Sequence, residues 1–304
     1  MSISSTGVLK EMPMTAHCVQ AANARLGESP SWDHIHGVLY WVDGERPAVF
    51  RWDPFKGQTG HWPMPHLVGC VSPAKEGRLI FADAEGLGYL DLDTGDIARI
   101  GNPQSETDRL QNLFNDGKVD RAGRLWVGSI DRQSARPTGS LYRLDPDLST
   151  HRLDSGFICS NGMGWSPDDR TMYFTDSLVR TIWAYDFDSS TGKLADRRVF
   201  AKLSDDDGLP DGLTVDSDGF VWSAIWDGWR VIRYTPDGVI DQELRLPVQR
   251  PTSCTFGGPD LQTLYVTSAS TELAGHVLKK GPLAGALFSV RTEVAGLPTV
   301  PFGT

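Results

Sequence analysis

Four polar residues of this chain have side chains and positions suited to binding a divalent cation. Glu28, Asn115, Asn161 and Asp211 each head a segment that continues into an apolar run. Two carboxylates without a basic neighbour repel each other, so burying them together requires a cation or a shared proton. An amide carbonyl adds an oxygen ligand without adding charge, and an all-oxygen set favours calcium, magnesium or manganese. We therefore predict that Glu28, Asn161 and Asp211 hold one divalent metal ion.

The segments that these residues head form an internal repeat. Each copy has a short strand, a turn rich in Asp, Gly or Pro, and an aromatic or β-branched second strand, as in NGMGWSPDDRTMYFTD from Asn161 to Asp176. The copies begin at Glu28, Gly69, Asn115, Asn161, Asp211 and Ser253. A third strand follows in most copies, and stretches such as IARIG and RRVFAKL fit a fourth. These patterns predict strands separated by turns rather than helices.

Four strands in every roughly 40–50 residues are typical of a propeller blade. We predict an all-β fold, a single six-bladed β-propeller over 1–304 with four-stranded blades, a central metal site and a flexible N-terminal segment at 1–14. Because an open ring would leave exposed strand edges, the segment at 15–20 is expected to complete the last blade. The innermost strands of such a ring surround the axis, which brings the heads of the segments together at one mouth.

Asn-Gly and Asp-Gly pairs also occur in ordinary turns, and a single pair is more often a turn than part of a site. Here Asn115, Asn161 and Asp211 precede a strand at the same phase of the repeat, where tight hairpin turns are not expected. The shared phase favours one common site over three unrelated turns.

The composition argues against several classes of partner. The 304 residues carry a net charge of −10 and contain no run rich in Lys or Arg, which disfavours nucleic acid and anionic membranes. No stretch has the apolar length of a signal peptide or a membrane span. The four cysteines are widely spaced without a CxxC pair, so we expect buried free thiols in a cytoplasmic protein. A closed propeller is expected to be a monomer.

Five segments resemble the senescence marker protein/gluconolactonase/luciferin-regenerating-enzyme family. They are LGESPSW (26–32), FNDGKVDRAGRLWVG (114–128), SNGMGWSPDDRTMYFTDS (160–177), LPDGLTVDSDGFVW (209–222) and TSCTFGGPDLQTLYVTSA (252–269). The similarity extends over nearly the whole chain. The motifs are specific in combination, although each is weak alone.

The resemblance implies a six-bladed propeller in which Glu28, Asn161 and Asp211 bind the metal. It also implies that Asn115, in the FNDG segment, contacts the substrate or a metal-bound water. Because family members accept several divalent ions, calcium is expected first, with zinc, manganese, magnesium or iron as alternatives. The implied reaction is hydrolysis of a sugar lactone, an aldonolactone or a related compound, to the open-chain sugar acid. Some family members act on organophosphates.

The chain departs from the family pattern at Leu113. Family members often carry Arg two residues before the FNDG asparagine, where it would hydrogen-bond substrate oxygens, whereas this chain reads QNLFNDG. The departure favours a less polar lactone, or a sugar lactone held by other groups. Two other functions stay open, a phosphotriesterase-like hydrolase on the same metal site and a non-catalytic ligand-binding propeller. GxSxG, HExxH and GxxxxGK[ST] motifs are missing, which disfavours a serine hydrolase and a zincin.

In the predicted mechanism the metal ion polarises the lactone carbonyl, and Asp211 activates the attacking water as general base. Glu28 serves chiefly as an anchoring ligand. The candidates for substrate contacts are Asn115, Asp131, His66 and Trp226. Structural roles compete with two of these, because Asp131 stands at the start of a long loop and Trp226 suits packing between blades. His66 lies just before the second copy's head, from where it could face the mouth.

Overall fold

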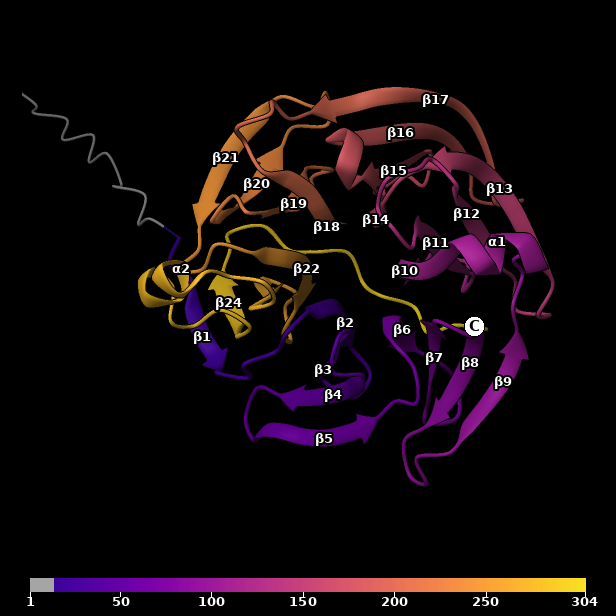
Figure 1. The fold of residues 1–304 in the computed structure, drawn as a ribbon, viewed down its shortest axis with the longest axis horizontal. Helices are drawn as coiled ribbons and strands as arrows, with labels where there is room; N and C mark the ends of the chain where they lie inside the picture. The colour runs from indigo at the N-terminus through magenta and orange to yellow at the C-terminus, as the bar shows by residue number, and fades with distance from the viewer. Residues whose placement is uncertain (1–13) are drawn as a thin grey trace, which may run out of the picture.

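Residues 14–304 are described by a computed structural model and form six four-stranded antiparallel sheets, which are arranged as blades around a central axis (Figure 1). This arrangement confirms the six-bladed β-propeller predicted from the repeat. The expected flexible segment at 1–14 lies outside the described residues except for Met14, which packs against the core of the last blade.

In the first five blades the strands follow one another in chain order from the central axis outwards. The first three blades contain β2 (Gly27–Asp33), β3 (Val38–Asp43), β4 (Ala48–Asp53) and β5 (Gly57–Pro63); β6 (Val68–Pro73), β7 (Arg78–Asp83), β8 (Gly86–Asp91) and β9 (Ile97–Gly101); β10 (Asn112–Val119), β11 (Leu125–Asp131), β12 (Gly139–Leu144) and β13 (Thr150–Phe157). The next two contain β14 (Ser160–Trp165), β15 (Thr171–Asp176), β16 (Thr181–Asp188) and β17 (Lys193–Lys202); β18 (Leu209–Val215), β19 (Val221–Trp226), β20 (Arg230–Tyr234) and β21 (Ile240–Arg245).

The sixth blade joins the two ends of the described chain. It contains β22 (Pro251–Gly257), β23 (Thr263–Ser268), β24 (Leu287–Arg291) and, as its outermost strand, β1 (His17–Gln20). His17 pairs with Ser289 and Cys18 with Phe288. The prediction that the segment at 15–20 completes the last blade is therefore confirmed, and the pairing covers an edge that would otherwise be open.

The core lies between the blades. Among the described residues, six hydrophobic clusters each join two neighbouring blades. Between the third and fourth blades, for example, Trp126 packs edge-to-face on Trp165, with the ring centroids 5.9 Å apart. The aromatic and β-branched second strands of the repeat supply much of this packing, because both faces of each blade are covered by its neighbours.

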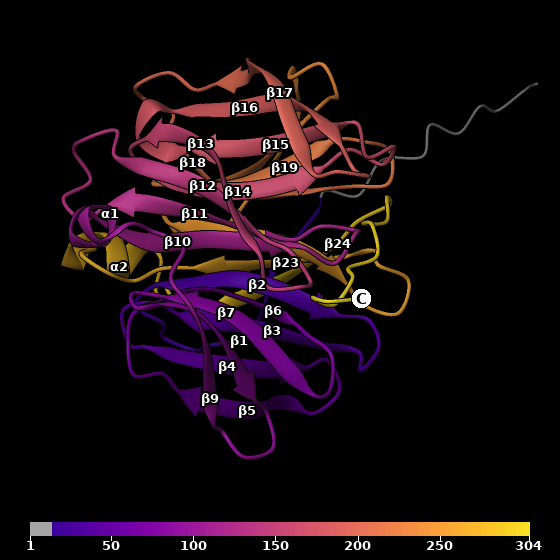
Figure 2. The same ribbon diagram turned by 90° about the vertical axis from the view of Figure 1, so that its right-hand side faces the viewer.

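The ring of blades has two different ends along its axis, and we call each end a mouth. Each innermost strand begins at one mouth, which we name the head mouth, and ends at the other, the tail mouth. The helices α1 (Glu106–Gln111) and α2 (Gly275–Lys280) lie in connections between strands on the head-mouth side. The C-terminus lies on the opposite side (Figure 2). Because the two helices are short, they cover little of the head mouth.

The C-terminal segment crosses the tail mouth, and we name residues 295–303 the strap. At one end the Ser217 amide donates to the Ala295 carbonyl at 2.8 Å, and Gly296 bridges to Asp216. At the other end the Phe302 amide donates to the Pro73 carbonyl at 2.8 Å, and the Phe302 ring is buried. The strap thus ties the fifth blade to the second across the axis (Figure 1).

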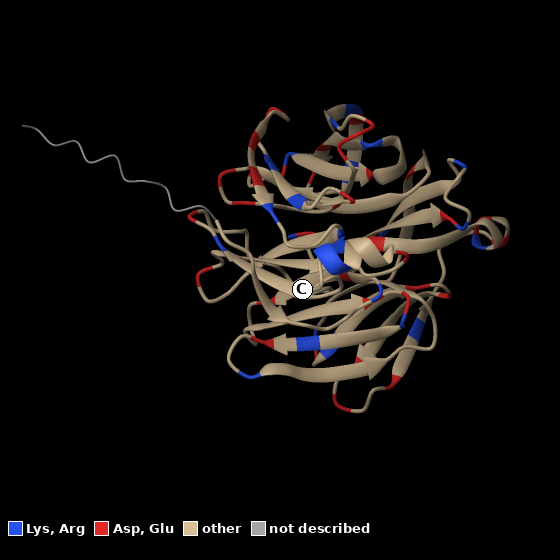
Figure 3. Cartoon of the chain, turned by 60° about the vertical axis from the view of Figure 1, so that its left-hand side comes forward, with Lys and Arg blue, Asp and Glu red and all other residues tan. Residues whose placement is uncertain are grey.

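Cysteine placement follows the expectation in part, and charge is spread over the surface. Acidic and basic residues are interspersed over loops and strand ends (Figure 3). The four cysteines are free, as predicted, and Cys70 and Cys254 are buried, but Cys18 is exposed because β1 is an outermost strand. Among the described residues no helix is long and apolar enough to cross a membrane.

Candidate functional site

The heads of all six innermost strands depart from regular pairing. Each strand shifts its register against the second strand at its head, between Glu28 and Ser31, Val68 and Cys70, Phe114 and Gly117, Ser160 and Met163, Pro210 and Leu213, and Pro251 and Cys254. A bulge of this kind bends the strand and re-aims its side chains. The repeat therefore supplies both the residues of the head mouth and the local irregularity that releases them from the sheet.

Glycines that follow the heads let neighbouring innermost strands approach closely. A Cβ atom on Gly162 would lie 2.3 Å from the Leu213 amide nitrogen, and one on Gly212 would lie 2.0 Å from the Ser253 hydroxyl. Neither contact is tolerable for real atoms. The glycine of each Asn-Gly or Asp-Gly pair is thus required by contact between blades, which explains why the pair recurs at the same phase.

Three carboxylates influence one another at the head mouth. Burial raises the pKa of Glu28 well above its usual value, and repulsion from Asp211 and then Asp116 raises it further. Burial and repulsion from Asp116 likewise raise the pKa of Asp211. Burial raises the pKa of Asp116 to about 6, although the Lys118 ammonium acts in the opposite direction. The mouth is therefore a place where negative charge is costly without a compensating cation.

Asn161 and Asp211 each present an oxygen without a partner. Asn161 is 7% exposed, and its Nδ2 donates to the Ser177 hydroxyl at 3.0 Å, which leaves Oδ1 without a hydrogen bond. Asp211 is 5% exposed, and its Oδ1 also lacks a hydrogen bond. Buried oxygens of this kind are normally satisfied, so two in one mouth suit a cation or a hydrogen-bond donor as partner.

Glu28 and Asn115, the other two of the four polar heads, each have one side-chain atom held by a hydrogen bond. The Ser29 amide donates to Oε2 of Glu28 at 2.8 Å. Nδ2 of Asn115 donates to the Ser160 carbonyl at 2.9 Å, which fixes the amide plane and leaves Oδ1 without a hydrogen bond in the described part of the chain. Both side chains are half-buried. They therefore have fixed positions and are open enough to meet a ligand.

A divalent cation fits this set of donors. The oxygens of Glu28, Asn161 and Asp211 are those that hard cations prefer, and a cation would offset the repulsion between the carboxylates. Within residues 14–304 no three His, Cys, Asp or Glu side chains are arranged to hold a metal ion. Any site at this mouth consequently needs an amide ligand, and Asn161 has the unpartnered oxygen for it.

Asp131 is placed differently from the heads. It ends β11, is buried, and its Oδ2 accepts from the amides of Ala135 (3.0 Å) and Arg136 (3.1 Å). These amides hold its pKa below the usual range. Asp83, at the end of β7, accepts from the Glu85 amide in the same way. Asp131 is thus bound within its own loop, and direct contact with substrate stays a prediction.

His66 and Trp226 lie at the rim of the head mouth. His66 is half-buried in the connection before β6 and makes no hydrogen bond within the described residues. Trp226 ends β19, and the Arg250 guanidinium lies over its ring at 4.4 Å from the centroid. A cation–π contact with Arg250 gives the ring a packing role on the rim, and neither substrate contact is tested by this geometry.

Comparison with known proteins identifies the family. A family model described as the SMP-30/Gluconolactonase/LRE-like region matches residues 26–270. The chain belongs to this family. The resemblance found in the motifs is confirmed, and the matched region contains every residue predicted for the site.

Relatives of this family member align over almost their full lengths. Regucalcin of Gallus gallus is 38% identical, over 94% of this chain and 97% of its own. Pentonolactonase XacC of Haloferax volcanii is 36% identical, over 94% of this chain and 97% of its own. The crystal structure of a calcium-binding regucalcin from Agrobacterium tumefaciens superposes with a TM-score of 0.90 at 26% identity, covering 96% of this chain and 98% of the other.

Asp116 is a residue of the head mouth that was not predicted from the sequence. The repeat argument selected one head in each copy, and in a regular strand the neighbour of Asn115 would point to the other face. The bulge between Phe114 and Gly117 leaves both residues unpaired, and Asp116 acts on the pKa values of Glu28 and Asp211. The signal in the sequence was the pair of polar residues before a glycine.

Proposed function

We propose that this protein hydrolyses a sugar lactone to the open-chain sugar acid at the head mouth, with one divalent metal ion, calcium by preference. The main observation in support is that Asn161 and Asp211 each have a buried oxygen without a hydrogen bond, beside carboxylates that repel one another. Family membership and the pentonolactonase relative support lactone hydrolysis as the reaction class.

Glu28, Asn161 and Asp211 would hold the metal through side-chain oxygens. A bound divalent cation would supply charge compensation for the carboxylates and polarise the lactone carbonyl. Glu28 is the anchoring ligand, since its Oε2 is already fixed by the Ser29 amide. The Ser177 hydroxyl orients the Asn161 side chain by accepting a hydrogen bond from Nδ2, which leaves Oδ1 available to the metal ion.

Asp211 is the general base of the proposed reaction. Its carboxylate takes a proton from the attacking water as the oxygen forms a bond to the carbonyl carbon of the lactone. The bond between that carbon and the ring oxygen then breaks. Asp211 returns the proton to the departing ring oxygen, so the ring opens to a hydroxy acid with atoms and charge in balance.

Asn115 positions the substrate or the attacking water. The Ser160 carbonyl holds its Nδ2, so Oδ1 is the atom left to accept a hydrogen bond. His66 and Trp226 border the same mouth and are proposed as further contacts, whereas Asp131 is proposed to act by shaping the loop at 132–138. Leu113 is half-buried two residues before Asn115 and offers an apolar surface, which suits a lactone with fewer hydroxyl groups on that side.

A substrate panel tests this proposal. Five- and six-membered sugar lactones, less hydroxylated lactones and a phosphotriester would be followed with a pH indicator, before chelation, after chelation and after return of single metals. We expect metal-dependent hydrolysis of a lactone, with little phosphotriester hydrolysis. Activity confined to the phosphotriester would replace the proposed substrate class. Folded, metal-loaded protein that hydrolyses none of them would favour a binding role.

A further inference from the structure

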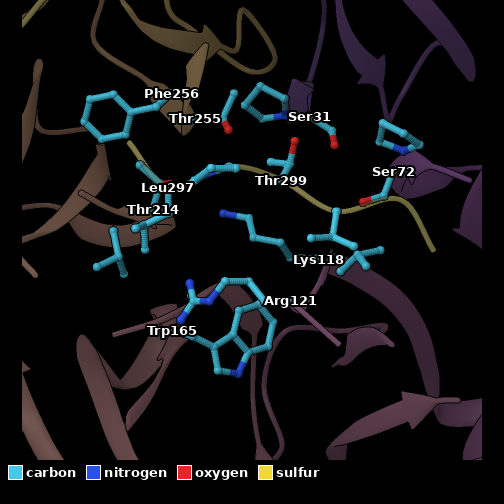
Figure 4. A pocket seen from close by; sticks show the side chains of 17 residues that line it. Ser31, Ser72, Lys118, Arg121, Trp165, Thr214, Thr255, Phe256, Leu297 and Thr299 are labelled. Carbon is cyan, nitrogen blue, oxygen red and sulfur yellow. The ribbon is translucent and has the colours of Figure 1, made fainter. Parts of the chain in front are cut away.

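The tail mouth carries a second ring of repeat-equivalent residues. They follow the heads by two or three positions on the six innermost strands and are Ser31, Ser72, Lys118, Gly164, Thr214 and Thr255. These residues line one cavity, with the Lys118 side chain reaching toward its middle (Figure 4). A single cation thus stands in a ring whose other members are hydroxyls and one glycine.

The strap lines this cavity on its outer side. Leu297, Pro298, Thr299 and Val300 form one wall, and Trp165 and Phe256 contribute apolar surface at the sides. The volume is about 70 Å³. Since one water needs roughly 10–15 Å³ by this measure, the space suits a ligand of about five non-hydrogen atoms.

The charge of the lining is positive, although the chain is acidic. Lys118 and Arg121 line the cavity, and no Asp or Glu does, in a protein with a net charge of −10. Arg121 is neutralised by Asp169, whose Oδ2 accepts from Nε at 2.9 Å. Lys118 donates only to the Leu213 carbonyl, at 2.6 Å, within the described chain, so two of its three donors are free.

The hydroxyl groups of the ring are also free. The side chains of Ser31, Ser72, Thr214 and Thr255 make no hydrogen bond within residues 14–304, in contrast to Thr299 of the strap, whose hydroxyl donates to the Trp32 carbonyl at 2.5 Å. Each hydroxyl can donate one hydrogen bond. Free hydroxyls around a free ammonium provide the donors that an oxyanion needs.

We propose that this cavity is a second ligand site, which binds a small oxyanion through Lys118 and the hydroxyl ring. The ligand class is inorganic phosphate or a carboxylate of about three carbons, because both offer several acceptor oxygens within the available volume. The site is separate from the head mouth, and it does not depend on the proposed lactonase activity.

Electrostatics favour an anion over other occupants. Burial lowers the pKa of Lys118, and Asp116 on the same strand only partly offsets this effect. A bound oxyanion would stabilise the ammonium from the tail side. A cation would meet like charge and no carboxylate, and an apolar ligand would leave the ammonium and the hydroxyls unpaired.

The experiment is a titration of full-length, metal-loaded protein with inorganic phosphate and, separately, with lactate. Heat of binding and the shift in Tm would be recorded at constant ionic strength with chloride as the replaced ion. We expect saturable binding of at least one of the two anions, and the two arms distinguish phosphate from carboxylate. The variant Lys118→Met should weaken binding by about 10- to 100-fold, as expected for loss of a charged hydrogen-bonding partner.

Three variants make the result specific. Lys56→Met removes an exposed lysine elsewhere and should bind as wild type, which controls for the change in net charge. Thr214→Val should weaken binding by about 2- to 10-fold even if Lys118→Met does not fold. Asp211→Asn disturbs the head mouth and should leave anion binding in place.

Two outcomes would overturn the proposal. One is the absence of saturable binding for both anions. The other is binding that Lys118→Met and Thr214→Val leave unchanged, or that Asp211→Asn abolishes, because either result would place the anion away from the tail mouth.

Discussion

The two mouths of the ring are built from the same six strands and differ in charge. At the head mouth, Glu28, Asp116 and Asp211 repel one another, and oxygens of Asn161 and Asp211 lack partners. At the tail mouth, Lys118 stands in a ring of hydroxyls beneath the strap. One lesson is that a repeat fold creates rings of equivalent positions, and the residue at each position decides which charge of ligand a ring accepts.

The largest contrast between the mouths is expected in metal affinity. Glu28→Gln removes a ligand charge, so the affinity for calcium or manganese should fall by more than about 100-fold, since loss of mere supporting partners costs 10- to 100-fold. Lys118→Met removes a positive charge near Asp116 and should retain or strengthen metal binding. Competition with a metal indicator measures both. Equal losses in the two variants would contradict the assignment of the metal to the head mouth.

The two mouths should also differ in how well they tolerate a larger residue in place of a glycine on β14. A Cβ on Gly162 would meet backbone of the next blade, and Gly162→Ala should destabilise the protein by about 1–3 kcal/mol. A Cβ on Gly164, at the tail mouth, would come closest to side-chain methyl groups of Val215 (3.0 Å) and Leu213 (3.1 Å), with the nearest backbone atom of Val215 at 3.9 Å. Gly164→Ala should stay within about 1 kcal/mol of wild type. Urea unfolding of both variants would test this, and the reverse order would be inconsistent with the packing described.

In metal-free protein, the head-mouth carboxylates should lower the free energy of unfolding as pH rises. Asp116 has a folded pKa of about 6, above the unfolded value near 3.9, so the folded state binds more protons between these values. The free energy of unfolding therefore decreases with rising pH through this window, and Glu28 and Asp211, whose pKa values are also raised, extend the decrease to higher pH.

Asp116→Asn isolates one part of this pH dependence. Without that carboxylate, the free energy of unfolding of metal-free protein should fall less from pH 4 to pH 8 than it does in wild type. The difference between the two changes should be on the order of 1–3 kcal/mol. Denaturant unfolding at several pH values would measure the difference. A difference in unfolding free energy between the two proteins that does not change from pH 4 to pH 8 would contradict the raised pKa of Asp116.

The smallest expected effect is at the rim. His66 is half-buried without a hydrogen bond in the described chain, so His66→Ala should change stability by no more than about 0.5 kcal/mol. If it donates one hydrogen bond to substrate, KM should rise by about 2- to 10-fold with little change in kcat. Steady-state kinetics on the preferred lactone would decide, and an unchanged KM would remove His66 from the site.

The sequence predicted the blades well because the repeat is local. The strand patterns, the spacing of the heads and the leftover strand at 15–20 were enough to predict six blades and their closure. The same argument applied three positions further along would have revealed the ring around Lys118. The strap was not predictable, because its path depends on long-range contacts such as Phe302 with Pro73.

The side chains were predicted less completely than the strands. Asp116 was missed because only the bulge brings it to the same mouth as Asn115. Asp131 was considered for substrate contact, although aligning the ends of the second strands places it with Asp43, Asp83 and Asp176, which bind backbone amides of nearby connections. Strand register, which decides both cases, is a tertiary property that local sequence specifies weakly around bulges.

The most direct test of the central claim is a metal titration of wild-type protein and Asp211→Asn. Both would be stripped of metal, and hydrolysis of the preferred lactone would be followed while calcium or manganese is returned. Activity should return only in wild type, and the variant should remain roughly 100- to 10,000-fold slower, the range attributed to a general base. Full wild-type activity without metal, or a wild-type rate in Asp211→Asn, would contradict the account.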